Sequence, residues 1–373
     1  MILTQCGVCA TELGTGGKRC GRCSTRYCGP ACQKQHWDAG GHDKLCKKIK
    51  KQGGAEQYNA NKKCSEAVAI AVDKCADDTK GQTCYICTQA LHWKTKEGLV
   101  RMCACRGTAG FAHVSCLAEQ AKILFAEAEA NNLDYKAKNE RWGRWHTCSL
   151  CEQDYHGVVR CALGWACWKT YVDRPETDDI RRPAITLLGN GLSDGKHYED
   201  ALSVREAELA MCRRLGASEE ELLNTLGNIA NSYHKLGQHE QAVCMRREVY
   251  TRALKLFGEG HKETLVEVNN YATDLCELRR FDEAKSLLRK AIPVARRSLG
   301  DRNENTLRLR WNYARALYLD DEVTPDGLRE AVTRLEELAP YARRILGGTH
   351  PGTTVIELTL RDAQAALRAA EQS

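Results

Sequence analysis

The sequence predicts two small zinc-stabilised α+β modules, built as cross-brace fingers, followed by an all-α helical solenoid. Sixteen of the 21 cysteines lie between Cys6 and Cys151, most of them in pairs separated by one to three residues. From residue 178 this pattern ends, and alanine, asparagine and glycine residues recur every 42 positions instead. A chain of 373 residues has room for two or three such domains.

The cysteine spacing indicates metal binding. Residues 1–5 lack the basic segment and apolar stretch of a signal peptide, and no run approaches the ~20 apolar residues that a membrane span needs. We therefore expect the protein inside the cell, in the cytoplasm or nucleus, without a membrane partner. In a reducing compartment, closely paired cysteines favour metal sites over disulfides. A disulfide framework is the alternative.

The first module, residues 1–50, contains eight candidate ligands in four pairs: Cys6 and Cys9, Cys20 and Cys23, Cys28 and Cys32, and His42 and Cys46. Eight ligands suffice for two tetrahedral zinc ions with no position left for water, which is typical of structural zinc. A segment of about 40 residues buries too little apolar surface to fold unaided. Bound zinc must therefore supply much of its folding free energy.

Together with Tyr27, Gln33 and Trp37 between the ligands, this pattern resembles a MYND finger. The resemblance implies interleaved sites, one formed by Cys6, Cys9, Cys28 and Cys32 and the other by Cys20, Cys23, His42 and Cys46. Residues 39–41 make the spacing from Trp37 to the closing histidine longer than usual, which should lengthen a turn without changing the ligands. His36 is an alternative ligand, although a solvated helical position suits it better.

MYND fingers bind proline-containing peptides, and the resemblance assigns this role to Gln33 and Trp37. An indole face can pack against a proline ring while an amide side chain hydrogen-bonds to an extended backbone. Alternatively, Trp37 simply covers the small core of the finger. One aromatic side chain can do both.

The second module, residues 81–155, again has eight candidate ligands in four pairs: Cys84 and Cys87, Cys103 and Cys105, His113 and Cys116, and Cys148 and Cys151. The ligand order and the Cys-x-Cys second pair resemble a RING-CH domain. Ile86, residues 106–110, Leu117 and Trp145 support this resemblance. A PHD finger shares the ligand order, but its second pair is not normally Cys-x-Cys.

RING-CH domains are ubiquitin ligases. The resemblance implies one zinc on the first and third pairs and a second zinc on the other two. The module would bind a ubiquitin-conjugating enzyme and position its thioester, so no catalytic residue is expected in this chain. Ile86 and Trp145 are the implied contacts for that enzyme. Glu152 stands where active ligases often place a basic residue that touches ubiquitin.

Three further segments are predicted to be helical. Residues 51–80 form a linker helix. Residues 119–140 form a helical insert within the second module, with a helix that ends near residues 131–132 and a second turn after it. Residues 156–177 form a helical extension. Three aromatic residues of this extension should pack the second module against the segment after it: Trp165, Trp168 and Tyr171.

Residues 178–373 carry the repeat. Three alanines recur at the 42-residue interval: Ala230, Ala272 and Ala314. Each unit is predicted to be two helices joined by a short turn, with alanine where the helices approach closely. With a Leu/Phe-Gly-x-x-His-x-x-Thr pattern, which includes His261 and Thr264, the array resembles the tetratricopeptide repeats of kinesin light chains.

Asparagines recur at the same interval: Asn228, Asn270 and Asn312. In kinesin light chains, asparagines at these positions line a concave groove and bind the backbone of extended peptides. The resemblance therefore implies partner peptides of this kind. Alternatively, these side chains are polar groups near turns that were repeated by duplication alone.

The formal net charge of +6 does not indicate a nucleic-acid partner. Fourteen cysteine thiolates and four zinc ions would together contribute −6, which brings the metal-bound protein near neutrality. The five lysines between residues 44 and 51 are expected to form a solvated face.

The sequence thus predicts a zinc-binding interaction protein with four zinc ions per chain. It leaves two functions open: a ubiquitin ligase whose MYND finger and repeats dock substrates, or a non-catalytic adaptor. A metal-dependent hydrolase fits less well because every predicted zinc site is closed.

Overall fold

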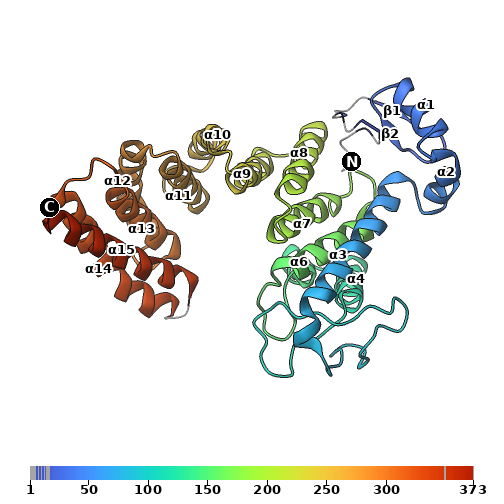
Figure 1. Ribbon diagram of the computed structural model, residues 1–373, viewed down its shortest axis with the longest axis horizontal. Coiled ribbons are helices and arrows are strands. Elements are labelled where there is room, and N and C mark those ends of the chain that lie inside the picture. Colours follow the sequence, from blue (N-terminus) through green and yellow to red (C-terminus); the bar gives the residue numbers. More distant parts are fainter. Residues whose placement is uncertain are drawn as a thin grey trace. The chain divides into compact units, whose positions relative to one another are not determined.

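The computed structural model describes residues 6, 8–9, 11, 13, 17–347 and 350–372, and it divides into two compact units, residues 1–216 and 217–373 (Figure 1). Residues 1–5, on which the expectation about a signal peptide rests, lie outside the described residues. Both units are mainly helical. No helix in the described part of the chain is both long and apolar enough to cross a membrane.

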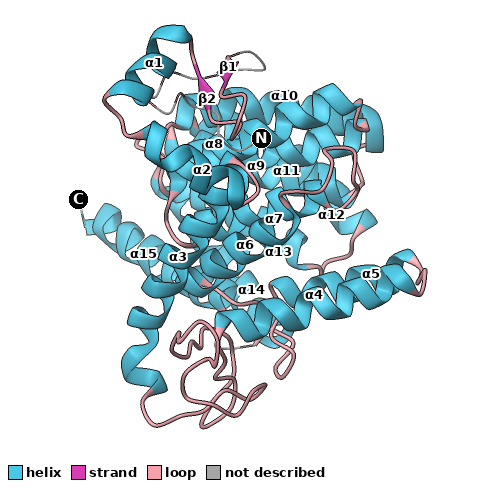
Figure 2. Cartoon of the chain, turned by 90° about the vertical axis from the view of Figure 1, so that its right-hand side faces the viewer, coloured by secondary structure: helices cyan, strands magenta, loops and turns pink. Residues whose placement is uncertain are grey.

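The first finger consists of a two-stranded antiparallel ribbon and two helices (Figure 2). Strands β1 (Lys18–Arg19) and β2 (Arg26–Tyr27) precede helices α1 (Pro30–Asp38) and α2 (His42–Lys51). Pro30 suits the first turn of α1 because its φ angle is already helical. The finger has a small core of its own, in which Leu13, Tyr27 and Ile49 pack around the cysteines.

The second module is held between helices of the first unit. Helix α3 (Ala55–Thr79) precedes it, and helices α4 (Val114–Ala130) and α5 (Tyr135–Trp142) lie within it, followed by a short 3-10 helix, Gly143–Trp145. The helical insert expected at residues 119–140 is therefore two helices, and the first ends close to residues 131–132, where its end was expected. The break follows from Asn132, which has a left-handed φ of 49°, and from Asp134, whose side chain accepts a hydrogen bond from the Ala137 N–H and caps α5.

The rest of the first unit comprises α6 (Gly157–Tyr171), α7 (Arg181–Asp194) and α8 (Tyr198–Leu215). Helices α6 and α7 approach closely at Gly191, where an added Cβ would lie 2.7 Å from the carbonyl oxygen of Arg160. One apolar core runs through α3, the second module, α6 and α7, and it includes all three aromatic residues expected to make this contact. Because of this packing, α7 and α8 belong to the first compact unit, and they lie within the residues 178–373 that were predicted to form the repeat array.

The second unit consists of three helix pairs and a last helix: α9 (Glu219–Lys235) with α10 (His239–Phe257), α11 (Lys262–Glu277) with α12 (Phe281–Ser298), α13 (Glu304–Tyr318) with α14 (Pro325–Leu346), and α15 (Pro351–Gln372). Ser218 and Glu221 form a reciprocal capping box at the start of α9. The three periodic alanines are fully buried, as expected where helices of one repeat cross closely.

Candidate metal centres and docking surfaces

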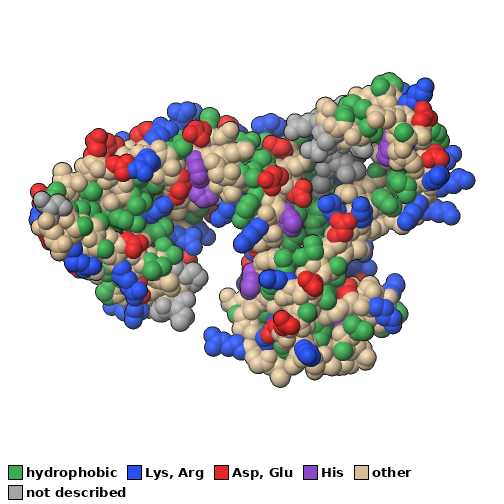
Figure 3. Space-filling view, viewed as in Figure 1, with side chains coloured by type: hydrophobic (Ala, Val, Ile, Leu, Met, Phe, Trp, Pro, Cys, Tyr) green, Lys and Arg blue, Asp and Glu red, His purple; other side chains and the backbone are tan. Residues whose placement is uncertain are grey.

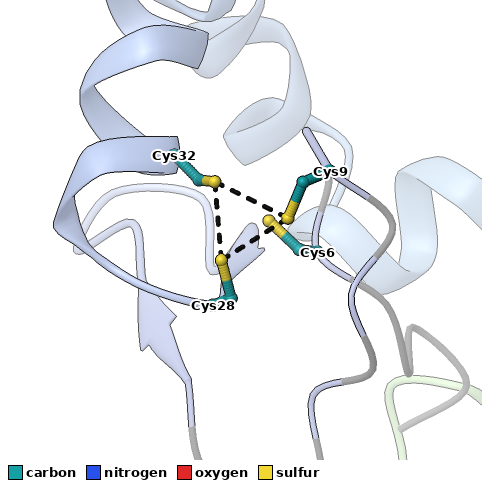
Figure 4. A group of neighbouring side chains, drawn as sticks. All are labelled: Cys6, Cys9, Cys28 and Cys32. Carbon is teal, nitrogen blue, oxygen red and sulfur yellow. Dashed lines mark hydrogen bonds between the residues drawn. The ribbon is translucent and has the colours of Figure 1, made fainter.

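The first cysteine group brings four sulfurs to one point. Figure 4 shows the side chains of Cys6, Cys9, Cys28 and Cys32 directed toward one another. The Sγ atom of Cys28 lies 3.5 Å from that of Cys9 and 3.4 Å from that of Cys32. A tetrahedral zinc ion with Zn–S bonds of about 2.3 Å holds its sulfurs about 3.8 Å apart. The group therefore needs to expand only slightly to accept the ion.

Three more groups have the same compactness, with all ligand atoms within 4.8 Å of one another: Cys20, Cys23, His42 and Cys46; Cys84, Cys87, His113 and Cys116; and Cys103, Cys105, Cys148 and Cys151. The structure thus gathers the same sets of residues that the two resemblances implied. All 21 cysteines are described and are free thiols, so the structure contains no disulfide framework. Zinc fits these sites because sulfur and imidazole are its preferred structural ligands.

The histidine of the third group is oriented by a second contact. Nδ1 of His113 lies 3.4 Å from the Cys87 sulfur and 3.5 Å from the Cys116 sulfur. Its other ring nitrogen, Nε2, donates to the carbonyl oxygen of Ala90 at 3.3 Å. Such a hydrogen bond fixes the tautomer that presents Nδ1 to a metal.

His36 lies outside both groups of the first finger. Its Nδ1 atom is hydrogen-bonded to the Tyr27 hydroxyl at 2.9 Å. The ring also packs beside that of His42, with 4.8 Å between centroids. His36 therefore contacts two residues of the finger through its ring. The prediction of a solvated helical position is correct for the helix but does not include these contacts.

The thiols of one group differ in acidity because they share protons. A hydrogen bond from the Thr11 hydroxyl helps to lower the pKa of Cys9 to about 6. In contrast, the hydrogen bond between the Cys28 and Cys32 thiols, together with the one that Cys32 donates to Cys9, raises the pKa of Cys32 to about 12. Zinc requires thiolates, so the ion must displace the protons that remain, and its binding will release protons.

Trp145 cannot contact a conjugating enzyme, which corrects the expectation from the sequence. Its side chain is fully buried, and its ring lies 5.8 Å from that of Tyr171 and 6.4 Å from that of Trp142. The indole is large and apolar, and it packs in the shared core of the first unit instead of lying at the surface.

Leu150 provides the exposed apolar residue that Trp145 does not. Leu150 is 51% exposed inside the last cysteine pair, and Ile86 is 36% exposed inside the first. A hydrogen bond of 3.0 Å between the Tyr85 hydroxyl and Ser149 Oγ ties the two loops together. The signal was present in the sequence, because Leu150 occupies in its Cys-x2-Cys pair the same place that Ile86 occupies in the first.

The peptide-contact residues of the first finger lie on α1. Trp37 is 44% exposed, while its ring lies 5.8 Å from that of His42. Gln33 is half-buried one turn earlier on the same helix. Trp37 therefore covers a metal-ligating histidine with one side and presents the other to solvent.

The three periodic asparagines do not share one environment. Asn228 and Asn270 are half-buried, but Asn312 is fully buried. Its Nδ2 atom donates to Asn269 Oδ1 at 2.8 Å and to Thr273 Oγ1 at 3.1 Å. Asn312 therefore links α13 to α11, and the expectation that it contacts peptides is wrong.

A hollow of about 290 Å³ lies in the second unit. It is lined by Asn269 of α11, by Leu307, Arg308 and Trp311 of α13, and by Val355 of α15. Its walls are mainly apolar side chains with a few polar groups at the rim, which suits one or two side chains of a peptide.

Charged side chains of both signs are interspersed over the face shown in Figure 3. The five lysines between residues 44 and 51 lie on α2 and are exposed, as expected for a solvated face. Acidic groups pair with many of the arginines of the repeats, for example Glu219 with Arg252 at 2.7 Å. On the face in view, the charges are thus mixed rather than of one sign.

The comparisons with known proteins agree with two of the three predicted modules. A MYND finger family model matches residues 6–46, and two tetratricopeptide repeat models match residues 222–263 and 264–322. The chain contains a MYND finger and tetratricopeptide repeats. Both predictions are thereby confirmed, and zinc binding with them. None of these matches covers the second module.

No curated protein matches the chain. One similar solved structure is described as a kinesin light chain from Podosopora anserina whose tetratricopeptide-like repeats are nearly identical to one another. It is 20% identical to this chain, with a TM-score of 0.43. That match covers 52% of this chain and 89% of the other. BtubC from P. vanneervenii is 13% identical with a TM-score of 0.44, over 69% of this chain and 85% of its own.

Proposed function

We propose that the protein is a RING-CH-type ubiquitin ligase that acts by positioning, with its MYND finger and repeats docking substrates or partners. Four structural zinc ions would hold the two fingers, one in each of the compact ligand groups. Because every group offers four ligands, none leaves a position for a reactive water. We place the protein in the cytoplasm or nucleus, where thiols stay reduced.

The observation that carries this proposal is the surface made by Ile86 and Leu150. Both are exposed apolar residues, each inside a cysteine pair of the second module. The hydrogen bond between Tyr85 and Ser149 holds the loops of these two pairs side by side. Exposed apolar side chains on a rigid, metal-held surface are suited to anchor another protein. The conjugating enzyme would bind there and have its thioester oriented for attack by a lysine.

Peptide docking would use the other two modules. Trp37 and Gln33 present an indole face and an amide to a proline-containing peptide. In the repeats, Asn228 and Asn270 remain candidates for contacts to an extended backbone, together with the hollow beside Trp311. Asn312 has no part in this role because it is buried.

The test is a single-turnover assay in which a charged conjugating enzyme discharges ubiquitin to lysine. Ile86→Ala and Leu150→Ala should each lower the discharge rate by about 5-fold or more, since an interface anchor contributes roughly 1–3 kcal/mol. Ile123→Ala is the matched control, because Ile123 is also an exposed isoleucine but lies on α4 outside both zinc loops. Zinc content should be unchanged in all three variants.

A non-catalytic adaptor is the second candidate, and Glu152 favours it. A carboxylate lacks the N–H donors that a basic residue would offer to ubiquitin's carbonyl oxygens. If wild type and all variants show only background discharge with a panel of conjugating enzymes, while the protein still captures peptides, the adaptor is the correct account.

A further inference from the structure

A cluster of metal-ligating side chains without cysteine lies in the second unit. His234 is near the end of α9, His239 is the first residue of α10, and Asp274 lies in α11. One ligand atom of each lies within 4.8 Å of the other two. The cluster connects one helix pair of the repeats to the first helix of the next pair.

The burial of these groups resembles that of a metal site more than that of a surface ion pair. The Asp274 side chain is only 2% exposed, whereas that of His234 is 27% exposed and leaves a path for an ion. The rings of His234 and His239 lie 5.4 Å apart at 73°. Nδ1 of His239 is buried without a hydrogen-bond partner in the described part of the chain, so no such bond holds the ring through that atom.

The carboxylate of Asp274 is already oriented by an outer partner. Nε of Arg246 lies 3.4 Å from Asp274 Oδ2, while the other oxygen, Oδ1, accepts a hydrogen bond from His234 Nδ1 at 2.5 Å. Arg246 also pairs with Glu267 at 2.9 Å, which balances its charge. A carboxylate held through one oxygen, with the other directed at an imidazole, is a common arrangement around bound metals.

We propose that His234, His239 and Asp274 bind a divalent transition-metal ion such as Zn²⁺, with the fourth coordination position filled by water. Imidazole and carboxylate ligands suit zinc and its neighbours rather than Ca²⁺ or Mg²⁺. Metal–ligand bonds of about 2.0–2.1 Å in a tetrahedron place ligand atoms about 3.3 Å apart. His234 and Asp274 would therefore separate by less than about 1 Å as the ion replaces the shared proton.

An ion at this position would bind α9, α10 and α11 together. Adjacent repeats of a solenoid are coupled only through their shared interface, so the ion would raise the stability of that interface by mass action. This role is separate from that of the cysteine groups, whose ions hold the fingers of the other unit.

The test uses the full chain with its cysteine groups loaded with zinc, titrated with Co²⁺ and followed by visible absorption, calorimetry and thermal unfolding. One additional ion should bind, with cobalt d–d absorption but without a thiolate-to-cobalt charge-transfer band. It should raise the Tm of the repeats. His239→Gln should weaken this binding at least 10-fold and abolish the rise in Tm, and His234→Gln should do the same independently.

His156→Gln is the matched control, because His156 is an exposed histidine outside the cluster. It should bind the additional ion as wild type does. His239→Gln should keep the metal-free Tm, since no hydrogen bond through its Nδ1 is lost. Equal affinity in wild type and His239→Gln would overturn the proposal, as would a charge-transfer band showing that cobalt enters only the fingers.

Discussion

Arg144 and Glu152 form a two-pronged ion pair in which two guanidinium nitrogens donate to the two carboxylate oxygens, each at 3.0 Å. Arg144 lies in the short 3-10 helix before the last ligand pair, and Glu152 directly follows Cys151 with a left-handed φ of 54°. The pair spans the loop that carries Leu150. The basic group beside the proposed ubiquitin-facing position is therefore engaged by a carboxylate of the same chain.

Glu152→Arg should raise the rate of ubiquitin discharge by about 10-fold, if the new side chain contributes about 1.4 kcal/mol to the reactive complex. The replacement also removes the partner of Arg144 and leaves two cations at the loop. The fold should change in stability by only about 1 kcal/mol or less, because the carboxylate is mostly exposed.

The single-turnover discharge assay measures the effect of this change. Glu152→Ala is its control, because it frees Arg144 without supplying a second basic group. If Glu152→Ala also discharges ubiquitin faster than wild type, the gain in rate comes from the release of Arg144 and not from the new arginine. If both variants discharge ubiquitin at the wild-type rate, the carboxylate does not limit activity.

Cys28→Ser should unfold the first finger and leave the rest of the chain folded. The finger has its own core, and a serine cannot replace the thiolate that holds the ion. Elemental analysis should show that the variant loses up to two of four zinc ions, while far-UV circular dichroism remains strongly helical. Loss of most of the helical signal would show that the finger shares more of the fold than its core indicates.

Cys84→Ser should be more disruptive than Cys28→Ser. Cys84 belongs to the core that also contains Trp145, Trp168 and Leu188, so loss of its zinc site removes support from α3, α6 and α7. We expect a lower Tm for the whole first unit, whereas Cys28→Ser changes only the finger. Equal thermal unfolding profiles for the two cysteine variants would contradict this prediction.

The candidate ligand groups were predictable from the sequence because their information is local. A thiolate pair such as Cys6 and Cys9 is recognisable by its spacing alone, and zinc chemistry restricts what such pairs can do. The helical repeats were predictable for a related reason, since a 42-residue period in small residues such as Ala230 and Ala272 indicates where helices must cross.

What the sequence could not show was which side of an element faces solvent. Trp145 and Asn312 occupy the positions that the resemblances in the sequence suggest for partner contacts, but both are buried in this chain. Their burial depends on partners distant in sequence, Tyr171 for the indole and Asn269 for the amide. The division of the chain at Gly216 has the same origin, because the packing of α7 on α6 sets it.

The stability of the first unit should depend on pH through Glu208. Burial within α8 raises the pKa of Glu208 to about 7, although the Thr186 hydroxyl donates to it. The folded state thus holds this proton more tightly than the unfolded chain, where the pKa is 4.5. The stabilisation that the folded state gains from protonated Glu208 is complete below pH 4.5 and is lost as the pH rises through about 7.

Glu208→Gln keeps the shape of the side chain but removes its titration. Relative to wild type, the variant should gain about 2–3 kcal/mol in free energy of unfolding between pH 5 and pH 8. Urea unfolding of both proteins at a fixed zinc concentration measures this difference, and zinc loss at low pH affects both alike. A difference that stays constant with pH would mean that Glu208 is ionised throughout.

Asn312→Ala should destabilise the repeats, whereas Asn270→Ala should not. Replacement of Asn312 removes two hydrogen bonds, to Asn269 and Thr273, and leaves these half-buried groups without this donor. Such a loss costs about 1–3 kcal/mol. Asn270 is the matched control because it is the same residue at the equivalent repeat position, but it is half-buried.

Urea unfolding of the repeat unit, together with capture of an extended peptide, separates the two roles. Asn270→Ala should weaken capture while the free energy of unfolding stays within about 0.5 kcal/mol of wild type, as is usual for replacements outside the core. Asn312→Ala should shift the unfolding midpoint and affect capture only through the folded fraction. If Asn312→Ala unfolds like wild type, the bonds from α13 to α11 contribute nothing, and burial of the amide does not explain why this position carries asparagine.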